Sequence, residues 1–327
     1  MHPDGAIETS DFARLPAAPL VSVLMVAYNH EAYLADAIEG VLAQRCESPM
    51  ELLIGEDCSR DGTLGIALDY QARHPDVIRV VHGEVNVGAG ANLGRITDRA
   101  RGKYIAYCDG DDHWCDPAKL ARQVGIAEGD PHVGAVHSDW VRARRVQDAW
   151  RHAPRSEHAG VPRKWLEGDL FATFYFPKVL RSCTLVYRRD AVEAFFASPL
   201  GQKRYRFGDT VMAAWITSRW RVGYVDAVTA VYRESPNSAL RSGARSKLVF
   251  LRSALEFDTD ARGYFADRKD YPHAYRWEVA IGLLIRACLL RDWKTARFAL
   301  ADLRAHYDFA GFLRAGWRAA SLRVRRG

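Results

Sequence analysis

Closely paired cysteines and long apolar runs are missing from this sequence of 327 residues, and its first residues do not have the pattern expected of a secretory leader. Its six cysteines are scattered without the spacing of a zinc site or a disulfide framework, which favours a reducing compartment. The longest apolar stretch, residues 279–290, is interrupted by Arg286 and is too short to span a bilayer. The N-terminal segment carries Asp4, Glu8 and Asp11 and no apolar core, so it is not expected to be a signal peptide. A cytoplasmic location is therefore predicted.

Positive charge is concentrated in the last part of the chain. The whole sequence has a net charge of +6, and residues 281–327 alone carry ten Lys and Arg against three Asp. Because the remainder is close to neutral, nucleic acid is not expected as a partner. Residues 247–327 also repeat apolar and basic side chains at helical spacing. Two interpretations stay open: an extension that touches the inner face of an anionic membrane peripherally, or a helical cap packed on the preceding domain.

Apolar strand patterns alternate with helical patterns through the first part of the chain. The predicted strands are residues 21–27, 51–55, 77–82 and 103–108. The predicted helices are residues 31–44, 64–73 and 93–101. This alternation predicts an α/β fold with a mostly parallel, doubly wound sheet flanked by helices. Residues 1–19 are expected to be a loose lead-in, residues 142–163 a long mobile excursion, and the chain from residue 244 onward helical.

Three carboxylates follow the predicted strand at residues 103–108 directly. They are Asp109, Asp111 and Asp112, with Gly110 among them. Because clustered carboxylates repel one another, a cation or hydroxyl groups are expected to neutralise them, and hard oxygen ligands suit Mg²⁺ or Mn²⁺. In open α/β sheets, ligands bind beyond the carboxyl ends of the strands. The alternative is a solvated acidic turn that caps the next helix.

Five short motifs stand in a fixed order over residues 20–141. They are Val-Ser-Val-Leu-Met-Val-Ala-Tyr-Asn-His (21–30), Gly-Glu-Asp-Cys-Ser-Arg-Asp-Gly-Thr (55–63), Asn-Val-Gly (86–88) with Asn92, Gly-Lys-Tyr-Ile (102–105) and Cys-Asp-Gly-Asp-Asp-His-Trp (108–114). Together they resemble the inverting nucleotide-sugar glycosyltransferases of family 2, which have the GT-A fold. Residues 182–190 and 208–237 extend the resemblance, and the C-terminal part falls outside it.

The resemblance implies a donor site at the ends of the first strands. Asp57 stands where family members place the carboxylate that binds the nucleotide base. Asn86 and the backbone near Val26, Ala27 and Tyr28 would line the same pocket. A carboxylate suits uracil and guanine equally well, so the base stays open. Asp57 could also form an Asx turn that opens the next helix.

The acidic turn matches the family's Asp-X-Asp motif. This resemblance implies that Asp111 coordinates the divalent ion, Mg²⁺ or Mn²⁺, that bridges both phosphates. Asp109 would bind the ribose or a water on the metal. Such an ion stabilises the negative charge on the departing nucleoside diphosphate. For Asp112, capping of the helix that begins near Pro117 is the alternative to a role in the site.

Two further positions follow from the resemblance in the second half of the chain. Asp209 occupies the place of the general base, which takes the proton of the acceptor hydroxyl, and it would also suit a helix N-terminus. The usual Glu-Asp pair appears here as Gly-Asp, so Asp209 would act alone. Many relatives carry a histidine where this chain has Ser235. Arg233 is expected to supply positive charge instead.

The sequence therefore predicts a metal-assisted, inverting glycosyltransferase. Its donor would be a UDP-, GDP- or dTDP-sugar, and its acceptor a hydroxyl of a cell-surface glycan or lipid-linked saccharide. The predicted domain covers residues 20–243, with a nucleotide-binding half (20–141), an acceptor half (142–243) and a helical basic extension (244–327). The alternatives are an inactive nucleotide-sugar-binding partner subunit and a membrane-surface adaptor. Five aromatic residues could form an acceptor platform or pack in the core: Trp165, Phe171, Phe174, Tyr175 and Phe176.

Overall fold

The computed structural model describes residues 5–147, 149–175, 179–203, 205–234, 244–272, 274–306 and 313. The chain forms two compact units. The first unit comprises residues 1–158, 180–194 and 219–234, and the second comprises residues 159–179, 195–218 and 235–327. Both units therefore contain parts of the predicted acceptor half.

A mixed sheet of ten strands forms the first unit, with the order β1-β4-β3-β2-β5-β9-β7-β10-β6 and β8 paired with β7. The strands are β1 (Ile7–Thr9), β2 (Val21–Ala27), β3 (Met50–Glu56), β4 (Ile78–His82), β5 (Tyr104–Tyr107), β6 (His113–Trp114), β7 (Val133–Val146), β8 (Ala149–His152), β9 (Val186–Arg188) and β10 (Arg221–Arg233). Strands β2 to β5 run parallel, as the alternating pattern predicted. Strand β9 is antiparallel to β5 and β7, and β10 is parallel to β7.

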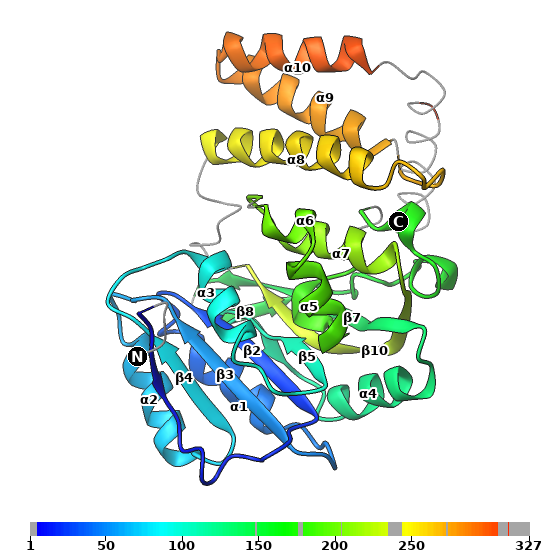
Figure 1. The fold of residues 1–327 in the computed structure, drawn as a ribbon. Coiled ribbons are helices and arrows are strands. Elements are labelled where there is room, and N and C mark those ends of the chain that lie inside the picture. The colour runs from blue at the N-terminus through cyan, green and yellow to red at the C-terminus, as the bar shows by residue number, and fades with distance from the viewer. Residues whose placement is uncertain are drawn as a thin grey trace. The chain divides into compact units, whose positions relative to one another are not determined.

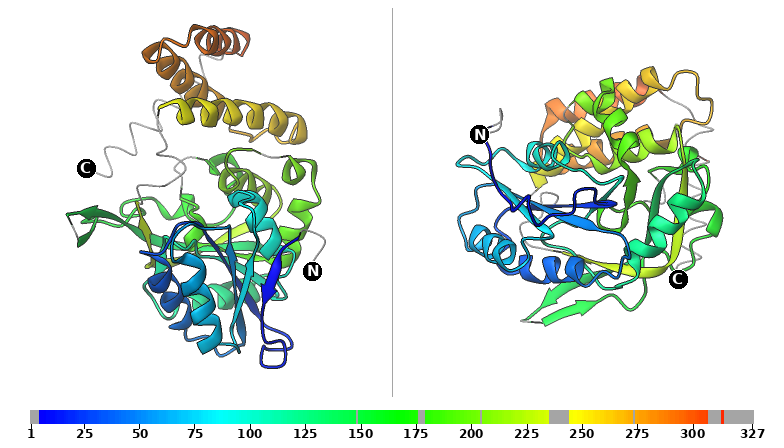
Figure 2. Two further views of the ribbon diagram at one scale, coloured as in Figure 1. Left: turned by 90° about the vertical axis from the view of Figure 1, so that its left-hand side faces the viewer. Right: turned by 60° about the horizontal axis from the view of Figure 1, so that its bottom comes forward.

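Helices cover both faces of this sheet (Figures 1 and 2). Their bounds are α1 (Leu34–Leu42), α2 (Thr63–Arg73), α3 (Ala89–Thr97), α4 (Lys119–Gly129) and α5 (Arg189–Phe196). Helices α1, α2 and α4 pack into one continuous core with β2 to β5, and α3 lies against β2 and β3 on the other face. The apolar face of α1 is fully buried because its residues recur at helical spacing. Each large side chain buried in this way contributes about 1.5–3 kcal/mol.

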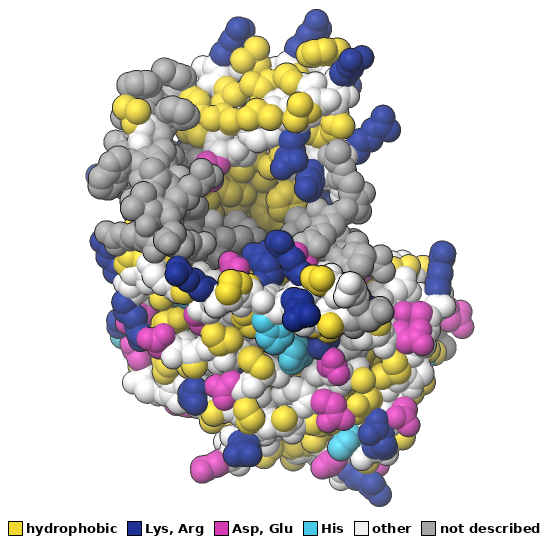
Figure 3. All heavy atoms as spheres, turned by 180° about the vertical axis from the view of Figure 1, so that it is seen from behind, with side chains coloured by type: hydrophobic (Ala, Val, Ile, Leu, Met, Phe, Trp, Pro, Cys, Tyr) yellow, Lys and Arg dark blue, Asp and Glu magenta, His cyan; other side chains and the backbone are white. Residues whose placement is uncertain are grey.

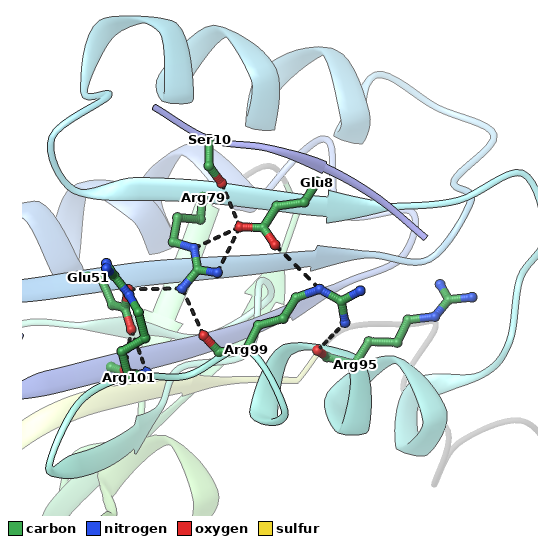
Figure 4. A network of polar contacts seen from close by, with 8 residues as sticks. Glu8, Ser10, Glu51, Arg79, Arg95, Arg99 and Arg101 are labelled. Atoms are coloured by element: carbon green, nitrogen blue, oxygen red, sulfur yellow. Dashed lines mark hydrogen bonds and ion pairs between the residues drawn. The ribbon is translucent and has the colours of Figure 1, made fainter. Parts of the chain in front are cut away.

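The N-terminal segment is not the loose lead-in that the sequence suggested. Residues Ile7–Thr9 form β1, which pairs with β4 at the edge of the sheet. Glu8 lies 2.7 Å from Arg79 Nη2 and 3.4 Å from Arg99 Nε, and all three side chains are buried (Figure 4). A buried carboxylate needs such partners, and these two arginines hold the strand in place.

The same network reaches the amino-terminal ends of the central strands (Figure 4). Glu51 accepts hydrogen bonds from Ser22 Oγ at 2.6 Å and from Arg101 N at 2.8 Å, and it pairs with Arg79 Nη1 at 3.0 Å. Burial alone would raise the pKa of Glu51, but the bonds from Ser22 and Arg101 and the charge of Arg79 outweigh it and hold the pKa below its ordinary value. These contacts explain why α3 ends at Thr97 rather than at residue 101: the backbone that follows it binds this network, with Arg99 O accepting from Arg79 Nη1.

A second correction concerns residues 142–163, which were expected to be a mobile excursion. Strand β7 continues to Val146 and returns as β8, with Ala143 paired to His152. Arg142 lies 3.3 Å from Glu157 and 2.7 Å from Glu234, so paired charges hold this polar segment on the sheet. The polar residues of this segment therefore belong to a hairpin held by ion pairs, and not to a loose loop.

The second unit is helical in its described part, and the helical prediction after residue 244 is confirmed there (Figure 1). Its helices are α6 (Pro199–Gln202), α7 (Asp209–Thr217), α8 (Ala244–Tyr264), α9 (Ala274–Leu289) and α10 (Trp293–Ala305). Asp258 is fully buried and pairs with Arg262 at 2.6 Å and with Arg276 at 2.9 Å, which ties α8 to α9. Among the described helices, none combines the length and the apolar character required to cross a membrane.

Candidate functional site

The sheet of the first unit brings most predicted site residues to one edge. Val26 and Ala27 end β2, and Asp57 directly follows β3. Asp109 and Asp111 follow β5, and Arg233 ends β10. Because these strands point the same way, all of these residues lie at the carboxyl edge of the sheet. Ligands of open α/β sheets bind at such an edge.

Two loops at this edge hold each other in place. Asn29 N donates to Ser59 Oγ at 2.9 Å, and Arg60 N donates back to Asn29 Oδ1 at 2.9 Å. His30 N donates to Thr63 Oγ1 at 2.8 Å. These bonds fix the backbone beside Tyr28, whose side chain is exposed. The loops therefore offer a rigid backbone and an available aromatic ring to a ligand.

Asp57 anchors the loop that follows β4. Its two carboxylate oxygens accept hydrogen bonds from the backbone N–H groups of Val87 and Gly88, each at 2.8 Å. Asn86 Nδ2 donates to the carbonyl oxygen of Asp57 at 2.8 Å, so the structure brings these two predicted residues together. Each carboxylate oxygen keeps a second lone pair that could accept from a base. Recognition of a base by Asp57 stays a prediction.

The acidic turn is packed closely against the end of β2. Gly110 N donates to Val26 O at 2.9 Å, and Asp112 N donates to Asp109 O at 3.0 Å. A Cβ on Gly110 would lie 2.8 Å from His30 Nδ1 and 3.2 Å from Val26 O, so only glycine fits without displacement. The spacing of the two flanking carboxylates depends on that close approach.

Asp112 connects the acidic turn to β10. It is buried, and its Oδ1 accepts from Arg233 N at 3.0 Å. Burial, followed by the charges of Asp111 and Asp109, raises the pKa of Asp112 well above its ordinary value. Asp112 does not cap the next helix: Ala118 stands at the N-cap of α4 and no side chain caps it, while Asp116 Oδ1 accepts from Ala118 N at 2.9 Å just before the helix.

Buried nitrogen atoms without hydrogen-bond partners lie close to this turn. They are His30 Nδ1, His113 Nδ1 and Arg233 Nη1, none of which has a partner within the described part of the chain. Arg233 is only 4% exposed and pairs through Nη2 with Asp36 at 2.6 Å. Such donors and acceptors are costly to leave unpaired, which points to a polar ligand.

From the sequence, His113 is expected to pack beneath the donor site without reacting, and His30 is given no role of its own. Burial lowers the pKa of His113 to about 4, with the charge of Arg233 acting in the same direction. Burial also lowers the pKa of His30 and outweighs the opposing charges of Asp111 and Asp61. Both rings are therefore neutral near pH 7. Their positions carried a signal, since His30 closes the first motif and His113 directly follows the acidic turn.

The acidic turn fits a divalent ion only in partnership with a substrate. No group of three or more His, Cys, Asp or Glu side chains among the described residues is placed to hold a metal alone. Mg²⁺ and Mn²⁺ sites commonly use one or two carboxylates, with water and substrate phosphates completing the shell. Asp109 and Asp111 supply carboxylates of that kind, and His30 Nδ1 adds an unpartnered nitrogen beside Gly110.

Asp209 belongs to the second unit, where it is the first residue of α7. Its Oδ1 accepts from Thr210 N at 2.8 Å. Burial first, then the charges of Asp258 and Asp209, raise the pKa of Tyr275 above its ordinary value, which places the Asp209 charge near that phenol. The positive end of a helix dipole favours a carboxylate at this position. Its role as a base stays a prediction.

The five aromatic residues have different surroundings in the second unit. Phe171 is buried with its ring centroid 5.1 Å from that of Phe265, and Phe174 is buried beside Tyr271, so both pack in the core. Trp165 and Tyr175 are half-buried. The positions of Phe176 and Ser235, and those of the tail beyond residue 306 apart from Leu313, lie outside the described residues.

Residues 22–196 match the family model described as "Glycosyl transferase family 2". The "Putative teichuronic acid biosynthesis glycosyltransferase TuaG" of Bacillus subtilis is 40% identical over 106 residues, which cover 32% of this chain and 41% of that protein. The chain spans about a third to two fifths of the length of the curated relatives that it matches most strongly.

Two solved structures share the fold. The mannosyltransferase PcManGT from Pyrobaculum calidifontis, in complex with GDP-Man and Mn²⁺, has a TM-score of 0.55 and 17% identity over 94% of this chain and 82% of that chain. S. aureus TarS 1-349, in complex with UDP-GlcNAc, has a TM-score of 0.52 and 15% identity over 88% of this chain and 93% of that chain. These likenesses confirm the predicted α/β fold of GT-A type.

Proposed function

The chain belongs to glycosyl transferase family 2, and on that premise we propose that it moves one sugar from a nucleotide-diphosphate donor to an acceptor hydroxyl, with inversion. The observation that carries the proposal is the acidic turn at residues 109–112. This turn is locked to β2 through Gly110 and to β10 through Asp112 and Arg233. A fixed set of carboxylates beside unpartnered nitrogen atoms suits a diphosphate and a divalent ion.

In this proposal the donor lies along the carboxyl edge of the first unit. Asp57 and Asn86 bind the base, with the backbone of Val26, Ala27 and Tyr28 beneath it. UDP-, GDP- and dTDP-sugars all remain candidates. The complexes of TarS with UDP-GlcNAc and of PcManGT with GDP-Man support a nucleotide sugar as the donor class.

Asp109 and Asp111 would hold Mg²⁺ or Mn²⁺ together with the two phosphates, and Arg233 would add positive charge. Mn²⁺ in the PcManGT complex supports a divalent ion. Bound there, the ion would stabilise charge on the departing nucleoside diphosphate. These residues would hold the donor so that the acceptor oxygen can attack the anomeric carbon opposite the leaving diphosphate.

Asp209 would accept the proton of the acceptor hydroxyl as that oxygen attacks the sugar. Its place at the start of α7 supports the proposal, because the helix terminus stabilises a carboxylate that is ready to accept a proton.

The first test is a thermal-shift panel with UDP, GDP, dTDP and CMP, each with Mn²⁺ and with EDTA. A ligand that binds the folded state alone raises the melting temperature by mass action. We expect a metal-dependent shift with one nucleotide, and its loss in Asp111→Asn. No shift with any nucleotide would contradict the donor site.

An assay of glycosyl transfer distinguishes an active enzyme from an inactive nucleotide-sugar-binding partner. Asp209→Asn keeps the shape of the side chain and removes its basicity. We expect nucleotide shifts equal to those of the unmodified protein and a loss of glycosyl transfer of at least 100-fold. Full turnover in Asp209→Asn would show that Asp209 is not the base. If the unmodified protein transfers no sugar, the inactive-partner hypothesis is favoured.

We also propose a saccharide or lipid-linked saccharide of the cell surface as the acceptor, with peripheral contact of this protein at the inner membrane face. Figure 3 shows apolar side chains gathered on the C-terminal helices, with Lys and Arg at their margins. Ile285, Leu289, Leu290 and Trp293 are exposed where α9 ends and α10 begins. Residues 285–298 carry four Lys and Arg and only one carboxylate. Such a surface suits anionic lipid headgroups.

Sedimentation with vesicles tests this contact. We expect binding to phosphatidylglycerol vesicles, weaker binding to phosphatidylcholine, and loss of binding in Leu289→Glu and Trp293→Glu. Val146→Glu, at an exposed apolar position of β7, is the matched control. A dimer that Leu289→Glu dissociates would assign the surface to a second copy instead. Vesicle binding that Leu289→Glu leaves unchanged would place the contact elsewhere.

A further inference from the structure

Arg181 lies at the same edge of the first unit as the acidic turn, although no motif assigned it a role. It precedes a short 3-10 turn, Ser182–Thr184, which leads into β9. Because β9 runs antiparallel to β5 and β7, the residues before β9 meet those after β5. Trp114 Nε1 donates to Cys183 O at 2.8 Å and ties the two segments together.

The guanidinium of Arg181 lies against two aromatic rings that also contact each other. Its Cζ lies 4.7 Å from the ring centroid of Trp140 and 4.5 Å from that of Tyr232. Those two rings meet edge to face, with centroids 5.5 Å apart. Cation–π contacts of this kind hold a guanidinium in one place and leave its N–H groups free for hydrogen bonds in the ring plane.

Arg181 has no acidic partner within the described part of the chain. Its Nε is buried and lacks a hydrogen-bond partner there. Arg142, whose Cζ lies 5.5 Å from the same Trp140 ring, differs: Glu234 and Glu157 neutralise it at 2.7 Å and 3.3 Å. Arg181 is only half-buried, so the remaining N–H groups of its guanidinium are accessible and, with no acid paired to them, available to an anion from outside.

Electrostatic effects also connect Arg181 with the acidic turn. Burial raises the pKa of the Cys183 thiol, the charge of Asp112 adds to the rise, and the charge of Arg181 opposes it. Asp112 in turn accepts from the backbone N–H of Arg233, next to Tyr232. Arg181, Asp112 and Arg233 therefore belong to one neighbourhood, where the diphosphate of the proposed donor would lie.

We propose that Arg181 is a phosphate-binding residue of this site, with its planar fork of N–H groups directed at a phosphate of the nucleotide donor. The inference rests on the proposed nucleotide-sugar donor. The same chemistry could be offered by the phosphate of a lipid-linked acceptor, so the experiment distinguishes the two sources.

Calorimetric titration with UDP, UMP and uridine tests the proposal. If the thermal-shift panel selects GDP, the titration uses GDP, GMP and guanosine instead. In Arg181→Gln we expect the affinity for UDP to fall on the order of tenfold, with uridine binding unchanged. Arg181→Lys should recover part of the loss, since it keeps the charge without the fork. Arg189→Gln, at an exposed arginine of α5, is the control.

Farnesyl phosphate is the probe for the second source. A loss of its binding in Arg181→Gln, with UDP binding intact, would assign the residue to the phosphate of an acceptor. Equal losses for UDP, UMP and uridine would show a structural role and overturn the proposal, as would unchanged binding of both probes. If the unmodified protein binds no nucleotide, the proposed donor itself fails, and that result is separate from any effect of Arg181.

Discussion

Opposite ends of the same parallel strands hold two different kinds of charged cluster. At the amino ends, Glu8 and Glu51 are enclosed by Arg79 and Arg101, and the buried charges are matched (Figure 4). At the carboxyl ends, three carboxylates crowd into one turn. Close to that turn, His30, His113 and Arg233 keep nitrogen atoms without partners in the described part of the chain. Removing one partner from a matched buried cluster is costly, whereas unpartnered nitrogen atoms beside an acidic turn suit a polar ligand.

The largest predicted effect breaks the matched cluster. Arg79→Met leaves Glu8 and Glu51 buried without their main cation, which should cost about 3–5 kcal/mol of unfolding free energy. The midpoint of urea unfolding measures this loss. Arg79→Met combined with Glu51→Gln should recover part of it, because one unpaired charge is then removed. A loss below about 1 kcal/mol for Arg79→Met would mean that the network contributes little.

Asp111→Asn tests the other end of the strands. We expect metal-dependent nucleotide binding to disappear and glycosyl transfer to fall at least 100-fold, which corresponds to about 2.7 kcal/mol. Stability should change by less than about 1 kcal/mol, because the substitution also removes the repulsion between Asp111 and Asp109. Calorimetry and urea unfolding of the same sample measure both effects. Strong destabilisation in Asp111→Asn would contradict the contrast between the two ends.

The pH dependence of stability sharpens the comparison further. The pKa of Glu51 is lower in the folded than in the unfolded chain, so this carboxylate stabilises the fold above its unfolded pKa of about 4.3. That contribution is lost as the pH falls through the lower, folded value. In urea unfolding below pH 5, Glu51→Gln should therefore lose stability less steeply than the unmodified protein. Glu47→Gln, at an exposed position, should keep the original slope.

The smallest effect is expected at an exposed ion pair. Arg189 Nη1 lies 3.2 Å from Glu193 Oε1 on α5, and both side chains are largely solvent-accessible. Because water screens such a pair, Arg189→Gln should change the unfolding free energy by about 0.2–1 kcal/mol. If Arg189→Gln lost as much unfolding free energy as Arg79→Met, burial would not explain the difference between exposed and buried ion pairs.

Much of the first unit was predictable because its residues follow strict periodicities. The continuous apolar run of β2 and the helical spacing in α1 require burial on both sides of a parallel sheet. Polar segments were predicted less well. Residues 142–163 and the N-terminal segment look loose in sequence, yet ion pairs between distant residues, such as Glu8 with Arg79, hold them in place.

The sequence by itself determined the alternation of strands and helices, the acidic turn at the end of β5 and membership of a family, because these depend on local patterns. Only the tertiary structure decided which buried charges are matched. It paired Glu51 with Arg79 and Arg101, and it placed the half-buried Arg181 against Trp140 and Tyr232 without an acid among the described residues. The physical reason is that the cost of a buried charge depends on what lies within a few ångströms of it, and residues far apart in the chain supply those neighbours.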